Sequence, residues 1–132
     1  MGRTADRIFD DVVGLCFWET ADKADYQAVF VKQMNVILAE CFDANNSLRR
    51  KRGKAELKEI PEITELEDSP GYEDYFERMV IPYGVASLIY VEDDESGISN
   101  VYRAKYMEKL NEYSGARFVS AAEDDEEYEE EV

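Results

Sequence analysis

The residues with the most evident chemistry are acidic, and one short run of them resembles the start of a calcium-binding loop. In 92-EDDESG-97, a loop beginning at Glu92 would place Asp94, Ser96 and Gly97 at its third, fifth and sixth positions. The twelfth position must supply a bidentate glutamate, but it falls on Arg103. We therefore interpret this run as a solvated turn between two helices and predict no metal site.

The residue types give little evidence that the chain is an enzyme. The chain contains no histidine, which is the commonest general base and metal ligand. It also lacks the P-loop, GxGxxG, GxSxG and CxxC motifs. The 31 Asp and Glu residues will bring some carboxylates together by chance, so their spacing identifies no hydrolase. We predict a protein that is not an enzyme, with no catalytic residues and no cofactor.

The only basic cluster is 49-RRKRGK-54, and it permits three interpretations. It can be the solvated C-terminus of a helix, where positive charge suits the helix dipole. It can contact nucleic acid, although the surrounding acids and the lack of further basic stripes weaken this interpretation. It can dock on an acidic surface of a partner or of another copy of the chain. The first and third interpretations are equally supported; the residues concerned are Arg49, Arg50, Lys51, Arg52 and Lys54.

The aromatic residues and cysteines indicate a core rather than a binding platform. Most of the nine tyrosines lie on predicted helix stripes, where they can serve as core or interface anchors. Stacking on nucleic-acid bases would require interleaved basic residues, and only Arg103 and Lys105 come close. Cys16 and Cys41 also fall on apolar stripes, so we expect buried free thiols in a chain made in a reducing cytoplasm.

Length and composition predict one globular domain followed by an acidic tail. The chain has 132 residues, of which 45% are hydrophobic, which is enough for a core. The formal charge is −16, and residues 123–132 carry eight acids and no base, which leaves about −8 on the rest. We place a helical domain at 1–118 and the tail at 119–132. No stretch resembles a signal peptide or a membrane-spanning helix, and the charge argues against general binding to DNA or anionic membranes.

The spacing of apolar residues predicts the first two helices. The first covers residues 4–18 and is capped by Thr4. The second starts at Thr20 or Asp22 and runs to about residue 48, ending before Gly53. After it, residues 55–70 lose the helical pattern, which predicts an extended segment with a short strand at 62–66.

A third helix begins near Tyr72 and contains Pro82 and Gly84, two residue types that helices tolerate poorly. Pro82 predicts a kink near residues 78–80. Beyond the kink, residues 83–90 are apolar nearly all round, so this half lies either at the centre of a bundle or against another subunit. The predicted buried stripe of this helix contains Tyr72, Tyr75, Phe76, Met79, Tyr83, Ala86 and Tyr90.

A fourth helix completes the predicted fold. It starts with Ser99 or Asn100 as its cap, and Gly115 is a suitable stop. Its predicted stripe is Tyr102, Tyr106, Leu110 and Tyr113. The fold class is therefore all-α: a small bundle of about four helices with a short extended or β segment between helices two and three.

Five stretches follow one another in an order that is similar to a known family. A helix ends in NxxLAECFDANNSLR and is followed by a basic residue and a glycine; then come LxEIPEITELED, YEDYFER, IPYGVASLIY and, after the acidic turn, AKYMEKLNEY. Over roughly residues 20–115, this order resembles the adaptor, or head-completion, proteins at the head–tail connector of tailed bacteriophages. The first helix and the acidic tail contribute little to the resemblance.

The resemblance implies a structural role. Such adaptors form a ring, usually a dodecamer, that docks on the portal protein, extends the DNA channel and provides a platform for a neck, stopper or tail protein. It also implies synthesis in the host bacterial cytoplasm, a final place in the virion at the head–tail junction, and no membrane partner. DNA would pass without sequence-specific binding, which an acidic channel wall favours. We predict contacts with partners or other subunits at the basic cluster and at Ile63, Leu66, Pro82, Tyr83 and Tyr90.

A second function of a different class is a small acidic DNA mimic that inhibits a host nucleic-acid-binding protein. The length, helicity and charge of the chain allow it. The interleaved bases break a phosphate-like pattern, and the basic cluster fits this function poorly; the interleaved bases are Lys23, Lys32, Arg78, Arg103, Lys105 and Lys109.

Overall fold

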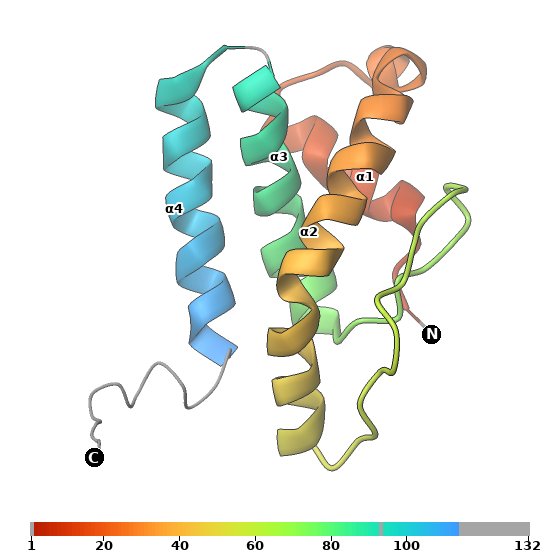
Figure 1. Ribbon diagram of the computed structural model, residues 1–132. Coiled ribbons are helices and arrows are strands. Elements are labelled where there is room, and N and C mark those ends of the chain that lie inside the picture. The colour runs from red at the N-terminus through yellow and green to blue at the C-terminus, as the bar shows by residue number, and fades with distance from the viewer. Residues whose placement is uncertain (1, 93, 114–132) are drawn as a thin grey trace.

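The computed structural model describes residues 2–92 and 94–113, and these residues form an all-helical bundle without strands (Figure 1). The predicted all-α fold is therefore confirmed. The predicted stop at Gly115 and the tail from residue 119 lie outside the described residues. The helices are α1 (Ala5–Leu15), α2 (Lys23–Lys51), α3 (Ile81–Glu92) and α4 (Ser96–Tyr113), with a 3₁₀ turn, η1 (Thr20–Asp22), before α2 and a π-helical turn, η2 (Phe76–Val80), before α3.

α1 begins as predicted but is shorter than predicted. The hydroxyl of Thr4 accepts a hydrogen bond from the N–H of Arg7 at 3.3 Å, which caps the helix. The helix ends at Leu15 because Phe17 adopts a left-handed backbone with φ 58°. The amide of Trp18 then bonds back to the carbonyl of Val13 at 3.0 Å, which closes the helix end. Glycine usually occupies such a position, so the presence of phenylalanine does not predict that the helix ends here.

α2 is the longest helix and ends as the sequence predicts, before Gly53. It continues to Lys51 rather than to residue 48. Gly53 has φ 74°, and the amide of Lys54 bonds back to the carbonyl of Arg49 at 2.8 Å. The buried side chains of α2 supply much of the core; they include Phe30, Met34, Ile37, Leu38, Cys41, Ala44 and Leu48.

The predicted strand at 62–66 is wrong, because side chains of α2 take the place of a partner strand. The side-chain amide of Asn35 donates to the carbonyl of Ile63 at 3.0 Å and accepts from its N–H at 2.8 Å. Asn46 makes the same pair of bonds with Leu57, at 3.1 and 2.8 Å. Asn45 accepts from the N–H of Glu73 at 2.8 Å. The polar backbone groups of an extended segment need partners, and here three asparagines meet part of that need.

A π-helical turn, η2, covers the region near residues 78–80 in which Pro82 predicts a kink. The N–H of Ile81 bonds to the carbonyl of Phe76, five residues earlier. Pro82 follows directly, inside a helical run that continues from residue 74 to Glu92, where proline removes one intrahelical hydrogen bond. A widened turn just before a proline is a usual way for a helix to accommodate that loss. The π-turn adds one residue and rotates the helical phase. Met79 is therefore 39% exposed, although the regular period predicts that it is buried.

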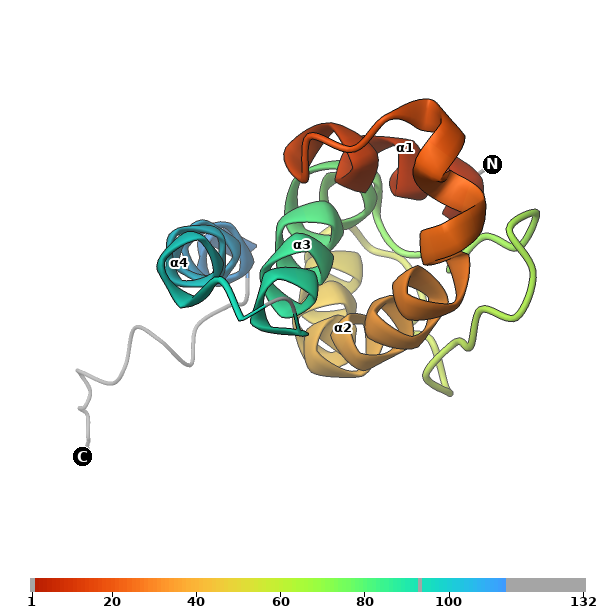
Figure 2. The same ribbon diagram turned by 90° about the horizontal axis from the view of Figure 1, so that it is seen from above.

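Gly84 lies where three helices approach one another. A Cβ atom at this position would lie 2.8 Å from Cδ1 of Ile37 and 2.9 Å from the ring of Tyr106. α3 thus occupies the centre of the bundle, between α4 on one side and α1 and α2 on the other (Figure 2). The apolar residues 83–90 are predicted from the sequence to lie either at the centre of a bundle or against another subunit, and the structure places them at the centre of the bundle.

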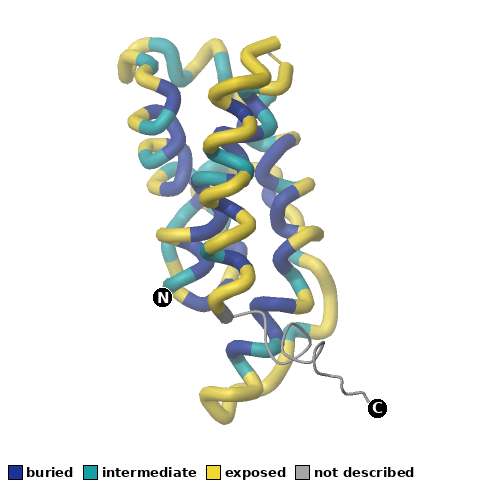
Figure 3. Tube along the Cα trace, turned by 90° about the vertical axis from the view of Figure 1, so that its left-hand side faces the viewer, coloured by how far each residue is buried: buried dark blue, intermediate teal, exposed yellow. Residues whose placement is uncertain are grey.

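α4 covers one side of α3 and keeps a broad exposed face (Figure 3). Tyr106 and Leu110 are buried, as predicted, and the hydroxyl of Tyr106 donates to Glu40 at 2.8 Å. Tyr102 is half-buried and donates to the carbonyl of Leu15 at 2.8 Å. The helix begins at Ser96 and not after a cap at Ser99 or Asn100, as predicted from the sequence. Ser99 is instead buried, and its hydroxyl donates to the carbonyl of Ser87 at 2.9 Å.

Candidate functional site

The basic cluster 49–54 divides into two groups, and the first group converges on one buried carboxylate. Glu73 has a side chain that is only 3% exposed. It forms ion pairs with Arg49 at 3.5 Å, Arg52 at 3.2 Å and Lys54 at 3.1 Å. These three bases therefore attach the end of α2 to the segment that leads into η2. The role of Glu73 is not evident from the sequence, because nothing in the local spacing distinguishes it from the other acids.

The second group, Arg50 and Lys51, is exposed. Arg50 pairs with Glu56 at 2.7 Å, and both side chains are about half-exposed. Lys51 forms no ion pair with any residue that the structure describes. For Arg50 and Lys51, both interpretations remain open: a solvated helix terminus or a docking surface. The other three bases of the cluster form ion pairs with Glu73.

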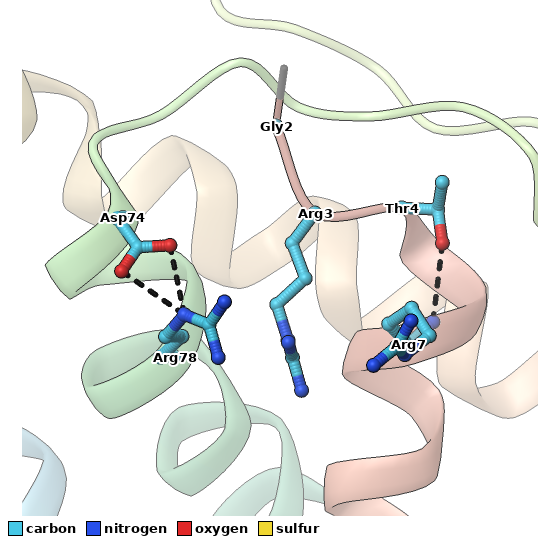
Figure 4. A pocket seen from close by; sticks show the side chains of 6 residues that line it. All are labelled: Gly2, Arg3, Thr4, Arg7, Asp74 and Arg78. Carbon is cyan, nitrogen blue, oxygen red and sulfur yellow. Dashed lines mark hydrogen bonds and ion pairs between the residues drawn. The ribbon is translucent and has the colours of Figure 1, made fainter.

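Three arginines that the sequence analysis did not bring together line a pocket of about 330 Å³ beside the N-terminal segment (Figure 4). Arg3 and Arg7 come from the start of the chain and Arg78 from η2, and Figure 4 shows the Arg3 side chain between the other two. Asp74 is the one acidic residue of the lining, and both of its carboxylate oxygens accept from Nε of Arg78, at 2.8 and 3.0 Å. We call this the arginine pocket. Only the tertiary fold joins residues 3 and 78, so no sequence signal could have found it.

Two carboxylates hold Arg3 in place. Glu77 is buried, and its oxygens accept from the N–H of Arg3 at 2.8 Å and from the N–H of Tyr72 at 3.1 Å. Burial raises the pKa of the Glu77 carboxyl, and the two backbone donors act in the opposite direction. Asp11 accepts two bonds from one terminal nitrogen of Arg3, at 3.1 and 3.0 Å. The Nε of Arg3 is buried and has no hydrogen-bond partner among the residues that the structure describes.

The arginine pocket and the Glu73 group are neighbours. A second pocket, of about 280 Å³, contains Arg49, Lys54 and Glu73 and shares Gly2 and Asp74 with the arginine pocket. The region contains six bases, and the acids Asp11, Glu73, Asp74 and Glu77 lie among them. We call it the basic region; its bases are Arg3, Arg7, Arg49, Arg52, Lys54 and Arg78.

The remaining predicted interface residues contact other parts of the same chain. Ile63 is 1% exposed and belongs to the core, and Pro82 is buried. Leu66, Tyr83 and Tyr90 are half-buried and pack against the core. These contacts give each residue a structural role, and their predicted part in contacts with partners stays a prediction.

The described residues form neither a cluster of metal ligands nor a membrane-spanning helix. Within 2–92 and 94–113, no group of three or more acidic or cysteine side chains lies close enough to hold a metal ion. None of the helices described is both long and apolar enough to cross a membrane. Cys16 and Cys41 are buried, as predicted, and neither forms a disulfide bond.

Comparison with known proteins gave no relative. The chain matches no protein-family model, and neither the curated proteins nor the solved structures contain a match.

Proposed function

We propose that this chain is a non-enzymatic structural subunit of a phage head–tail connector ring. In this role, copies of the chain dock on the portal protein and extend the DNA channel, and the ring provides a platform for a neck, stopper or tail protein. The observation that carries the proposal is the placement of the quoted stretches on successive elements of one bundle. NxxLAECFDANNSLR lies on α2, YEDYFER leads through η2, IPYGVASLIY opens α3, and AKYMEKLNEY forms the second half of α4.

The charge distribution along the bundle supports contact between copies. The acidic turn between α3 and α4, with Glu92, Asp94 and Glu95, lies at one end of the bundle, and the end of α2, with Arg50 and Lys51, lies at the other (Figure 1). Exposed apolar side chains flank the acidic turn: Val91 is 58% exposed and Val101 is 55% exposed. Opposite charges on two different surfaces favour a heterologous contact, which generates a ring when the rotation closes.

Native mass spectrometry tests the proposal directly. The purified chain is measured alone and with the portal protein encoded in the same genome. A ring of about a dozen copies, alone or only on the portal, is the expected result. A monomer or dimer that ignores the portal would overturn the proposal and favour the DNA mimic, for which DNA would compete with the chain for a basic protein.

The exposed bases give a sharper test of the contact between copies. Replacing Arg50 and Lys51 with glutamine should weaken ring formation and leave the melting temperature nearly unchanged, since their charges face solvent. Arg49 and Arg52 are poor choices, because their loss would also release Glu73. A Lys32→Gln variant, which changes an exposed base on the side of α2, is the matched control. Rings that form equally well in both variants would exclude the end of α2 from the interface.

A further inference from the structure

Phe17 is the most exposed large hydrophobic side chain that the structure describes, at 84%. It also has a left-handed backbone, with φ 58°, a conformation that costs free energy in residues with a Cβ atom and none in glycine. The phenyl ring offsets none of this cost within the described chain, because it belongs neither to the core nor to the side chains packed against it. An exposed aromatic residue on a strained backbone indicates a contact outside the chain.

A largely apolar pocket of about 240 Å³ lies between α1 and the start of α3, and we call it the α1–α3 pocket; its lining residues are Asp11, Leu15, Arg78, Met79, Pro82 and Tyr83. The two charged members are already paired, since Asp11 accepts from Arg3 at 3.0 Å and Arg78 donates to Asp74 at 2.8 Å. Met79, which the π-turn leaves 39% exposed, has a flexible thioether that can adapt its shape to an aromatic ring. The pocket therefore suits an apolar side chain rather than an ion.

Two lysines of α4 lie beside the α1–α3 pocket. Nζ of Lys109 is 5.9 Å from the centre of the Tyr83 ring, and Lys105 lies one helical turn away on the same side of α4. Neither lysine forms an ion pair with any residue that the structure describes, and this includes Glu108 and Glu112 of the same turns. The pocket is thus bordered by positive charge that has no salt-bridge partner in the described part of the chain.

Phe17 belongs to a loop of the opposite charge. Glu19, two residues further on, is exposed. The next base along the chain, Lys23, is bonded to Asp6 and Asp10, at 2.7 Å in each case, so it does not neutralise Glu19. Two residues of extended chain span about 7 Å, which keeps the Glu19 carboxylate close to whatever surface the phenyl ring of Phe17 enters. The loop therefore offers an apolar side chain and an acid to a surface that has an apolar pocket and two bases.

We propose that Phe17 of one copy binds the α1–α3 pocket of a second copy. In this contact, Glu19 faces Lys105 and Lys109 of that copy. Phe17 and the pocket lie close together in each chain, since Leu15 lines the pocket and Phe17 is two residues further on. Two copies related by a two-fold axis can therefore exchange their phenyl rings, and the contact closes as a dimer. The inference does not rest on the proposed connector function, because a dimer of the free chain is compatible with a ring that forms only on the portal.

Sedimentation equilibrium of the full chain and of Phe17→Gly tests the anchor. We expect the natural chain to dimerise and Phe17→Gly to raise the dissociation constant by about thirtyfold or more. The melting temperature of the monomer should change little, because glycine relieves the left-handed strain but gains freedom in the unfolded chain. Ile60→Ala, which trims a 49% exposed apolar side chain elsewhere, is the matched control and should dimerise normally. A natural chain that stays monomeric at about 1 mM, or an equally tight Phe17→Gly dimer, would overturn the inference.

Mixing two variants identifies where Phe17 binds. Met79→Glu places a carboxylate in the α1–α3 pocket, at an exposed position that tolerates it, and should also dimerise weakly. In an equimolar mixture with Phe17→Gly, the Phe17 of one chain meets the intact pocket of the other, so one of the two contacts is restored. Native mass spectrometry should then show heterodimers at concentrations about tenfold below those at which either variant pairs with itself. A mixture without heterodimers would show that Phe17 does not bind this pocket.

Two further measurements test the occupant and the charges. In ¹H–¹⁵N spectra of the natural chain, the Tyr83 amide should shift as the protein is concentrated; a difference from Phe17→Gly that does not depend on concentration would mean that Phe17 enters its own pocket, which contradicts binding between copies. Lys105→Glu with Lys109→Glu should weaken the dimer, and adding Glu19→Lys should restore part of the affinity. Loss of affinity without restoration would contradict the pairing of Glu19 with these lysines.

Discussion

Glu73 is a single buried carboxylate that faces three bases from the end of α2. Glu73→Gln keeps the size of the side chain but removes the charge that gathers Arg49, Arg52 and Lys54. We expect the free energy of unfolding to fall by about 1–2 kcal/mol; the loss stays below that of a fully buried pair because two of the bases are half-exposed. Urea denaturation measures it. Arg50→Gln, which breaks an exposed pair, should change stability by less than about 0.5 kcal/mol. Equal losses in the two variants would mean that burial gives Glu73 no advantage over a surface ion pair.

Cys41 illustrates the effect of burial on one titrating group. Its side chain is fully buried, and desolvation raises the pKa of the thiol to about 12. At pH 8, only about one thiol in ten thousand is then ionised, so a disulfide reagent should react with Cys41 no faster than the chain unfolds. Because the folded pKa is raised, this group favours folding least at high pH: stability is unaffected below the unfolded pKa and falls as pH rises from about 9 toward 12. The reaction rate is measured in a Cys16→Ala background, with the urea-unfolded chain as reference. Fast labelling of the folded protein would contradict the buried state.

At the scale of elements, Gly84 and Pro82 explain how α3 can occupy the centre of the bundle. Pro82 lies where the π-turn passes into the regular helix, and Gly84 lets α2 and α4 approach the backbone. Gly84→Ala should therefore lower the free energy of unfolding by about 1–3 kcal/mol, although alanine is the better helix former. The ring of Tyr106 cannot move aside easily, since its hydroxyl is bonded to Glu40. Gly14→Ala in α1 is the control: nothing lies within 4 Å of its added Cβ, so it should raise stability by up to about 1 kcal/mol. A stabilised Gly84→Ala variant would show that the three helices are less closely packed.

At the scale of the molecule, the sequence predicts what depends on local spacing and misses what depends on folding. The four helices follow from apolar residues at helical period, and the order of the elements is as predicted. The strand at 62–66 is wrong because the asparagines that satisfy its backbone lie on another helix, at positions that nothing local identifies. Met79 is predicted to be buried but is exposed, because the spacing of apolar residues does not reveal the π-turn. The arginine pocket joins residues more than seventy positions apart, so its three bases look like isolated surface charges in the sequence.

The asparagine contacts of α2 have a consequence for the exchange of amide hydrogens with solvent. The loop between α2 and η2 contains no regular structure, yet the N–H groups of Leu57 and Ile63 are each bonded to a side chain of a long, packed helix. These two amides should exchange with deuterium far more slowly than the amide of Lys58, whose position is exposed. Asn35→Ala should speed the exchange of the Ile63 amide and leave the Leu57 amide protected by Asn46. The Leu57 amide is therefore an internal reference in the same variant. Measured in this way, an irregular loop would carry two slowly exchanging amides that are protected by the side chains of a helix rather than by a neighbouring strand.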